Sequence, residues 1–313
     1  MFRFIFAFLF VLAPVLCFAQ AKVAILDFDD RSSEKKPQSK IIEAKLLKID
    51  RKALISHFNA GGDNNLAITL ADQIEAGNFD LAVVITSDAL RVARLRFAKT
   101  LFLFTNVNNP LFLGYSSMEK PGFNSSGVTY YVAIDKQLDF FRTISPKAKR
   151  FGFIFDDNAL SRQQEFKQSR EYCDKNEFGF SVQLIKSPEE TVEAAKKLLA
   201  EGVDAIILTS SGTVYDNTAD IVAEANAKNI PVYSYNKKSV ALGAVASLAS
   251  DYTVMNTQLL PPMMKKVLKG KVNPGTLPVQ FIKDPSPTLN NTAAKKLGIT
   301  IPPKILKKAG TVL

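Results

Sequence analysis

Short apolar runs alternate with amphipathic stretches along most of the chain. The runs are short and almost wholly apolar, as in buried parallel strands, and they cover 23–26, 81–85, 100–105, 150–155, 181–185, 205–208 and 230–234. Apolar residues recur with a helical period in the intervening stretches 135–144, 160–176, 188–200, 215–228 and 251–268. This alternation predicts an α/β protein with parallel sheets that helices cover on both faces.

Residues 49–80 have a less regular pattern than the rest of the chain. A helix is predicted before this region, around 41–47, and another within it, over 66–76, and Gly61-Gly62-Asp63 has the composition of a turn. No strand is predicted between the two helices.

One segment of the first half returns in the second half. Residues 77–87 (GNFDLAVVITS) resemble residues 202–210 (GVDAIILTS), and each copy is followed by a predicted helix and a further apolar strand. The repeat predicts two related α/β lobes.

The first 21 residues have the layout of a secretory signal peptide. Met1-Phe2-Arg3 is followed by the apolar run 4–18 and by the small residues of Ala19-Gln20-Ala21, which predict a mature N-terminus at Gln20 or Lys22. A membrane anchor is the alternative, but Pro14 interrupts a run that is short for a spanning helix. A lipid on Cys17 is another, although the large Leu16 precedes it. We expect an exported, periplasmic protein without a lipid anchor.

Composition and charge narrow the class of protein further. The 313 residues include 47% hydrophobic and 22% charged residues, which is globular composition and excludes a disordered chain. The net charge of +10 is carried by scattered lysines, such as Lys265, Lys266, Lys269 and Lys271 on one polar helix face. A solvated basic surface therefore explains the charge better than a nucleic-acid partner. After cleavage only Cys173 remains, so we expect no internal disulfide and a core position for this residue.

Motifs for catalysis, cofactors and metals are missing from the sequence. His57 is the single histidine and has no suitably spaced partner, and no phosphate-binding loop, dinucleotide fingerprint or Cys/His cluster occurs. Asp27, Asp29 and Asp30 could coordinate a cation, but a helix cap combined with a polar ligand contact fits them better. We therefore expect no cofactor, no metal and no catalytic residue.

Polar residues follow the predicted strands where each strand ends. Ligands bind beyond the carboxyl ends of strands in open parallel sheets. The candidate ligand-binding residues are Phe28, Asp29, Thr86, Ser87, Asp88, Asn106, Asn108, Asp156, Ser210, Ser211 and Tyr235. Alternatively, each polar residue only caps its own helix.

The candidates suggest how an amino acid could be bound. Hydroxyl groups and free N–H groups at a helix start suit a carboxylate, and Asp156 suits an ammonium group. Phe28 and Tyr235 could enclose a flat side chain between them.

Three stretches of the sequence resemble one known family. They are residues 105–110 with 120–129, residues 231–233 with 240–244, and residues 290–303. They resemble ABC-transporter substrate-binding proteins of the type that includes tryptophan and tyrosine binders, well over 80–306 and poorly over 22–80. The resemblance implies a type I periplasmic-binding-protein fold with three hinge crossings and a ligand between the lobes. Lobe one would then comprise residues 22–130 and 251–281, and lobe two residues 131–250 and 282–313.

The resemblance also implies a function. We expect the extracytoplasmic solute-binding component of an ABC importer, a monomer that binds a small amino-acid-like molecule and delivers it to a membrane permease. Two other classes stay open: a sensory module that presents its closed form to a membrane receptor, and a secreted α/β enzyme.

Overall fold

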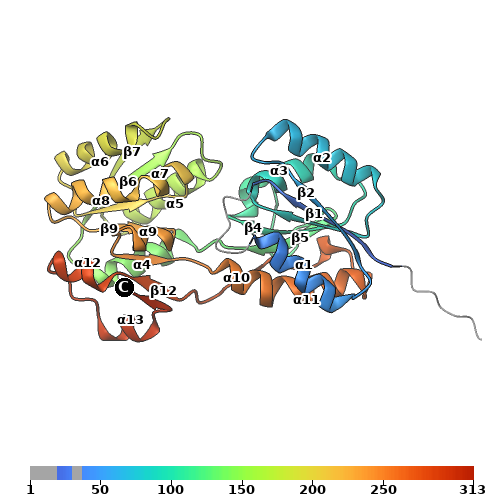
Figure 1. Cartoon of the computed structure of the whole chain (residues 1–313). Helices are drawn as coiled ribbons and strands as arrows, with labels where there is room; N and C mark the ends of the chain where they lie inside the picture. The colour runs from blue at the N-terminus through green and yellow to red at the C-terminus, as the bar shows by residue number, and fades with distance from the viewer. Residues whose placement is uncertain (1–19, 30–36) are drawn as a thin grey trace, which may run out of the picture.

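A computed structural model describes residues 20–29 and 37–313 of the chain. It has two α/β lobes joined by several chain crossings (Figure 1). The predicted two-lobed fold with helix-covered parallel sheets is confirmed. The predicted signal peptide and Cys17 lie outside the described residues, apart from Gln20 and Ala21.

Lobe one is built on a sheet of six parallel strands. Their order is β11-β5-β4-β3-β1-β2. The strands are β1 (Lys22–Asp27), β2 (Leu54–Asn59), β3 (Leu81–Ile85), β4 (Phe102–Val107), β5 (Ser125–Thr129) and β11 (Gln280–Phe281). The central strands β1, β3 and β4 are buried along almost their whole length, which explains their nearly continuous apolar sequences.

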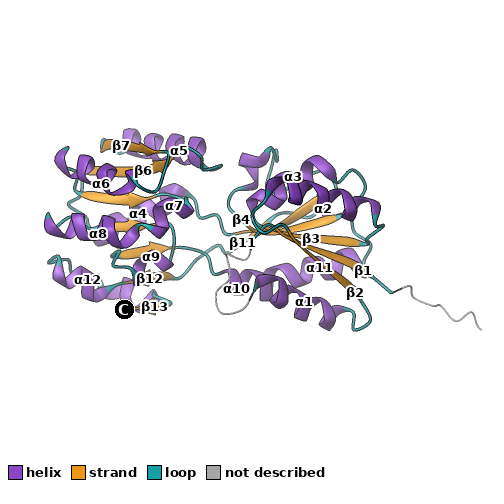
Figure 2. Cartoon of the chain, turned by 45° about the horizontal axis from the view of Figure 1, so that its top comes forward, coloured by secondary structure: helices purple, strands orange, loops and turns teal. Residues whose placement is uncertain are grey.

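Helices cover both faces of this sheet (Figure 2). One face packs against α2 (Asn64–Ala76) and α3 (Ser87–Arg96), and the other against α1 (Gln38–Ile49) and α11 (Leu260–Leu268). The shorter elements are the 3₁₀ turns η2 (Pro110–Leu113) and η4 (Pro274–Thr276), α10 (Tyr252–Val254) and the π-helical turn η3 (Met255–Leu259). The predicted helix over 251–268 is therefore a composite of two α-helical segments, α10 and α11, with the π-helical turn η3 between them.

Lobe two is built on a sheet of seven strands in the order β13-β12-β10-β9-β8-β6-β7. The strands are β6 (Arg150–Asp156), β7 (Gly179–Ile185), β8 (Ala205–Leu208), β9 (Val232–Ser234), β10 (Ala246–Leu248), β12 (Pro287–Leu289) and β13 (Thr311–Val312). Neighbouring strands are parallel except at the β10–β12 pair, where the C-terminal tail enters antiparallel.

The helices of lobe two also form two layers. Their bounds are α4 (Ile134–Ile144), α5 (Arg162–Lys175), α6 (Glu190–Ala200), α7 (Gly212–Asp216), α8 (Thr218–Ala227), α9 (Lys238–Ala241), α12 (Asn291–Lys296) and α13 (Pro303–Lys308). One core joins α4, α5 and α12 to the sheet and contains Cys173, whose predicted core position is confirmed by its complete burial. A second core joins α6 and α8 to the opposite face.

The chain passes between the two sheets three times. It leaves lobe one after β5, returns after β10 and leaves again after β11. The positions of the lobe boundaries at 130/131, 250/251 and 281/282 stay a prediction.

Three strands of lobe one, β2, β5 and the two-residue β11, were not predicted, and each lacks a continuous apolar run. Strand β2 has only partly buried and exposed residues. Strand β5 is fully buried but mostly polar, because Ser125 pairs with the Tyr115 hydroxyl at 2.7 Å and Ser126 donates to the Leu277 carbonyl at 2.8 Å. Gly127 is needed here, since a Cβ at this position would lie 2.1 Å from the Phe104 carbonyl oxygen.

Lysines are exposed on the outer helices of both lobes: Lys265 and Lys266 lie on α11 as predicted, and Lys269 follows at its C-cap. Lys271 does not lie on the predicted helix face, because the helix ends before it and its φ is +52°. Within residues 20–29 and 37–313, no helix is both long and apolar enough to cross a membrane.

Candidate functional site

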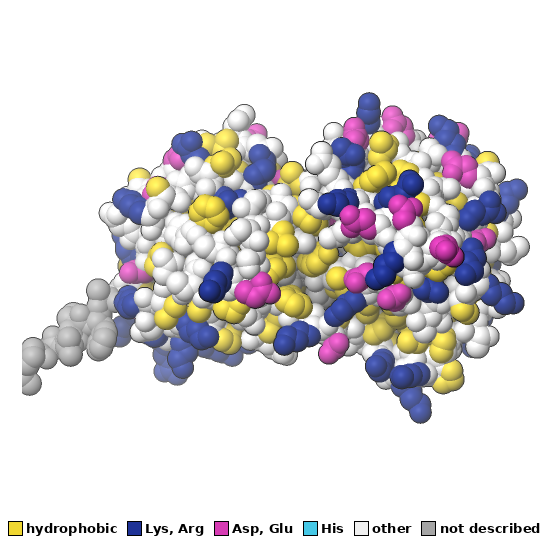
Figure 3. Space-filling model, turned by 180° about the vertical axis from the view of Figure 1, so that it is seen from behind, with side chains coloured by type: hydrophobic (Ala, Val, Ile, Leu, Met, Phe, Trp, Pro, Cys, Tyr) yellow, Lys and Arg dark blue, Asp and Glu magenta, His cyan; other side chains and the backbone are white. Residues whose placement is uncertain are grey.

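A cavity of about 820 Å³ lies where the carboxyl ends of the two sheets face each other. Seen from behind, a notch separates the two lobes at the upper edge of the molecule (Figure 3). Both lobes contribute to the cavity wall, and its size is in the usual range for small-molecule sites.

The cavity brings together ten of the eleven residues predicted to bind a ligand. They are Phe28, Asp29, Thr86, Ser87, Asp88, Asn106, Asn108, Asp156, Ser210 and Ser211. Tyr235 does not line this cavity. It lies behind it in the core of lobe two, where its ring stacks on Phe141 at a centroid distance of 6.3 Å. The role of these residues in binding stays a prediction.

The turn from β3 into α3 forms one wall in lobe one. Thr86 has a φ of +89°, which is rare for a β-branched residue and is typically found at functional sites. Thr86 also caps α3, since its side chain accepts from the Ala89 N–H at 3.4 Å. The Ser87 Oγ accepts from the Asn108 N–H at 3.2 Å, so it fixes the neighbouring strand end. The first N–H groups of α3 consequently start at the cavity wall, where an anion is favoured.

A buried polar network supports this wall from behind. Asn256 is completely buried in the π-helical turn η3, a type of turn often found at functional sites. Its Nδ2 donates to Gln38 Oε1 at 2.7 Å and to Asn106 Oδ1 at 3.0 Å, and its Oδ1 accepts from the Thr105 hydroxyl. Asn106, with a φ of +54°, is thereby held in a strained conformation at the end of β4.

A carboxylate and a hydroxyl form the facing wall in lobe two. Asp156, at the end of β6, accepts from the Ser211 hydroxyl at 2.7 Å and from the Asn158 N–H at 2.9 Å. Ser211 also caps α7 through the Val214 N–H at 3.3 Å. Thr86 and Ser211 therefore do cap their own helices, as the alternative prediction held, and both also line the cavity.

Four aromatic side chains of the cavity wall, besides the predicted Phe28, were not predicted from the sequence. Phe112, Tyr130 and Tyr252 line it from the side of lobe one, and Tyr215 lines it from lobe two. The rings of Tyr130 and Tyr252 are in contact at a centroid distance of 5.3 Å. Burial raises the pKa of Tyr130 and of Tyr215 well above the usual range, so both hydroxyl groups stay neutral. Tyr130 follows β5 directly, so the strand-end rule would have found it had β5 been recognised.

The acidic end of β1 does not cap a helix as predicted. Helix α1 begins after Pro37 and has no side-chain cap, because Asp27 and Asp29 are separated from it by residues 30–36. Asp30 lies outside the described residues. Among the described residues, no three His, Cys, Asp or Glu side chains gather as a metal site would require. His57 lies on β2 away from the cavity, and its Nε2 is 3.2 Å from Glu43.

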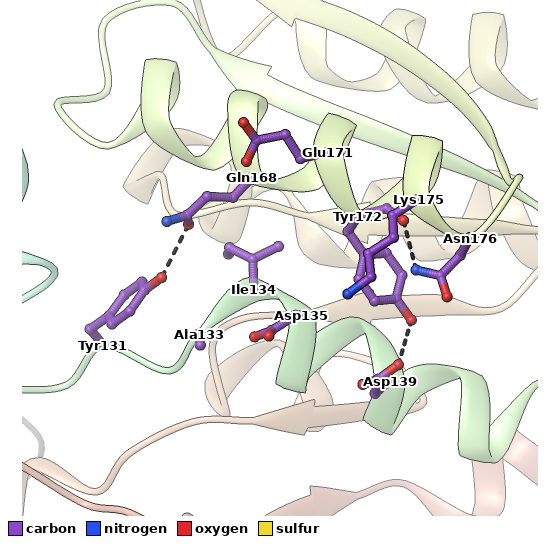
Figure 4. A pocket seen from close by; sticks show the side chains of 10 residues that line it. All are labelled: Tyr131, Ala133, Ile134, Asp135, Asp139, Gln168, Glu171, Tyr172, Lys175 and Asn176. Atoms are coloured by element: carbon purple, nitrogen blue, oxygen red, sulfur yellow. Dashed lines mark hydrogen bonds between the residues drawn. The ribbon is translucent and has the colours of Figure 1, made fainter.

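A second cavity of about 440 Å³ lies between α4 and α5 of lobe two (Figure 4). At one end of this cavity the Tyr131 hydroxyl donates to Gln168 at 3.1 Å. At the other end the Tyr172 hydroxyl donates to Asp139 at 2.6 Å. Its acidic residues Asp135, Asp139 and Glu171 are exposed. Since these carboxylates are already hydrated, this hollow offers weaker recognition than the cavity between the lobes.

A comparison with protein families matches residues 22–313 to the model of ABC transporter substrate binding proteins. A curated relative, the tyrosine-binding protein of Clostridioides difficile (strain R20291), is 26% identical over 264 residues. The alignment covers 84% of this chain and 76% of the relative.

The same fold is found in solved structures. An ABC domain in complex with L-Trp from Streptococcus pneumonia has a TM-score of 0.77 and 23% identity, over 94% of this chain and 100% of that chain. The ligand-free, open structure of a substrate binding protein with adhesive properties from Clostridium difficile also has a TM-score of 0.77, with 22% identity over 93% of this chain and 99% of that chain.

Proposed function

The chain belongs to the family of ABC transporter substrate-binding proteins, and on this basis we propose that it is the solute-binding component of an ABC importer. Proteins of this family are extracytoplasmic and bind small molecules, and the family is not one of enzymes. The observation that carries the proposal is the cavity between the carboxyl ends of the two sheets, whose wall combines polar strand ends with aromatic rings from both lobes.

The ligand that this wall suits best is an amino acid with an aromatic side chain. Its carboxylate would lie at the N-terminus of α3, with the Ser87 hydroxyl and the first N–H groups of the helix as donors. Its ammonium group would lie against Asp156 of lobe two. Opposite ends of the zwitterion would thus contact opposite lobes.

The side chain of the ligand would lie among the aromatic residues. Phe28 and Tyr130 are close to the strand ends of lobe one, and Tyr215 faces them from lobe two. Aromatic rings bind a flat apolar group through stacked or edge-to-face contacts. That the similar proteins are described as tyrosine-binding and as bound to L-Trp supports the same class of ligand here.

Binding would favour the closed arrangement of the lobes, because only this arrangement brings both walls into contact with one ligand. The permease would then recognise the closed form. Export with cleavage after Ala19 or Ala21 should give a mature N-terminus at Gln20 or Lys22 on sequencing, and an acylated Cys17 would contradict the proposal.

The test is titration calorimetry with L-tyrosine and L-tryptophan, supported by thermal unfolding. A ligand present at 100 times its dissociation constant should stabilise the native protein by about 2.7 kcal/mol. The methyl esters of both amino acids are matched controls, since they keep the ring and the ammonium group but lack the carboxylate charge. Binding of neither amino acid would contradict the proposed ligand class, and turnover of a bound amino acid would instead indicate an enzyme.

A further inference from the structure

A buried carboxylate lies directly behind the cavity, where the two lobes meet. Glu165 belongs to α5 of lobe two and is 2% exposed. No Lys or Arg among the residues that the structure describes forms an ion pair with it. A carboxylate in such a place is unfavourable unless other groups stabilise it, so its hydrogen bonds indicate what keeps it there.

The two oxygens of Glu165 are bound from different lobes. Oε1 accepts from Asn108 Nδ2 of lobe one at 3.1 Å. Oε2 accepts from the Ser210 N–H of lobe two at 3.0 Å. Asn108 and Ser210 both line the large cavity, so one side chain connects the two walls of the candidate site.

The neighbouring turn of α5 repeats this contact. Gln168 lies three residues after Glu165, on the same face of the helix, and accepts from the hydroxyl of Tyr131 in the chain crossing after β5 at 3.1 Å (Figure 4). This face of α5 is therefore directed at lobe one and at the crossing, whereas Glu171 on the outer side is exposed.

The surroundings of Glu165 are aromatic and contain few compensating charges. Tyr130, Tyr131, Tyr215 and Tyr235 are the titratable groups close enough to interact electrostatically with it. Burial is the main influence and raises the pKa of Glu165, while its hydrogen-bond donors act in the opposite direction. The loss of the Asn108 donor would therefore leave this carboxylate less stable in its buried position.

We propose that Glu165 is a positioning residue that joins the two lobes: its hydrogen bond to Asn108 forms only when the lobes are together and fixes Asn108 and Ser210 at the cavity wall. Moving the lobes apart breaks the Asn108 bond, admits water to the carboxylate and leaves the Ser210 bond within lobe two. The proposal rests on the proposed function, because it assumes that the cavity between the lobes holds the ligand.

The test is a double-mutant cycle with Glu165→Gln, Asn108→Ala and the double variant. Glutamine keeps the shape of the side chain, and its single oxygen can stay with the Ser210 N–H of its own lobe, so its NH2 group then faces Asn108 Nδ2 and the bond from Asn108 is lost. The radius of gyration of each ligand-free protein is measured by small-angle X-ray scattering, and L-tyrosine and L-tryptophan are the probes for affinity. Glu171→Gln on the same helix is the matched control.

We expect each single variant to increase the radius of gyration and to weaken amino-acid binding about tenfold, with no further loss in the double variant, because both changes break one bond. Additive effects, or a radius of gyration equal to that of the wild type in both single variants, would overturn the proposal. If neither amino acid binds the wild type, the proposed function is contradicted. The contact between the lobes is tested independently, because the scattering measurement needs no ligand.

Discussion

Behind the cavity, lobe one supports its wall with neutral amides and hydroxyls, whereas lobe two supports its wall with carboxylates. In lobe one, Asn256 bonds to Gln38, Asn106 and Thr105. In lobe two, Asp156 and Glu165 accept from Ser211, Ser210 and Asn158. The two sets of hydrogen bonds are similar in number, but only the lobe-two set contains ionisable acceptors.

This difference indicates that the amide network of lobe one mainly contributes to stability, whereas the carboxylates of lobe two mainly contribute to ligand recognition. A fully satisfied network of neutral groups fixes a backbone conformation and does not respond to pH in the physiological range. Buried carboxylates are sensitive to protons, to water and to a nearby positive charge. We infer that the amide network keeps the lobe-one wall rigid, while Asp156 of lobe two provides a charge for the ligand, in addition to Asp29 and Asp88 of lobe one, which also line the cavity.

The strongest test of this contrast is removal of the amide at the centre of the lobe-one network. Asn256→Ala removes three buried hydrogen bonds, although Thr105 can still donate to Asn106 at 3.2 Å, and we expect a loss of about 3 kcal/mol in the free energy of unfolding. Urea denaturation measures it. Asn65→Ala, an exposed position on α2, is the control and should change stability by less than about 0.5 kcal/mol. Equal, small effects would show that lobe one is not held by this network.

Removal of a carboxylate from lobe two should act on binding. Asp156→Ala takes away the proposed partner of the ligand's ammonium group, and the loss of a charge-assisted contact costs about 1.5–3 kcal/mol. We expect affinity for aromatic amino acids to fall more than tenfold in titration calorimetry. Asp220→Ala, exposed on α8, should bind as the wild type does. Unchanged affinity in Asp156→Ala would show that Asp156 does not bind the ammonium group of the ligand.

Ser87 provides the corresponding test in lobe one. Ser87→Ala removes a neutral hydroxyl and its bond to the Asn108 N–H, so we expect affinity to fall about tenfold, less than in Asp156→Ala. The melting temperature of the ligand-free protein should stay close to that of the wild type. Ser116→Ala is an exposed control. A larger loss of affinity in Ser87→Ala than in Asp156→Ala would contradict the assignment of the stronger ligand contact to lobe two.

The smallest expected effect is a dependence of stability on pH that comes from lobe two. Burial raises the pKa of Glu165 in the folded protein, so its contribution to stability is fully present below the pKa of the unfolded chain and is lost as the pH rises through the folded value. Wild type should therefore lose stability relative to Glu165→Gln as the pH rises above the ordinary glutamate pKa of 4.5. A constant difference between the two proteins as the pH rises would contradict the shift.

The polar strand ends in the cavity wall could be predicted, because their positions follow from the strands that precede them. Buried parallel strands have recognisable apolar sequences, and their carboxyl ends gather at one edge of a sheet. This rule located residues such as Ser87 and Asp156 without any knowledge of contacts. It did not locate Tyr130, because β5 is buried through the hydrogen bonds of its serines rather than through apolar side chains.

Two other residues show what the rule omits. Tyr235 follows a strand end but shares a face with Tyr233, since side chains alternate along extended chain, and both rings stack on Phe141 in the core. Glu165 lies within a correctly predicted helix, but its role depends on Asn108, 57 residues away in the other lobe. Helical periodicity gives the face of a residue and not its partner.

The three crossings between the sheets also determine the order in which the molecule can be completed. Strand β11 and helix α11 belong to lobe one, yet they follow the first five strands of lobe two in the chain. The bond between Ser126 and Leu277 joins residues 151 positions apart, as does the bond between Thr105 and Asn256. Contacts so distant in sequence form slowly. A chain that emerges N-terminus first therefore has an unfinished first lobe until most of the second has been made.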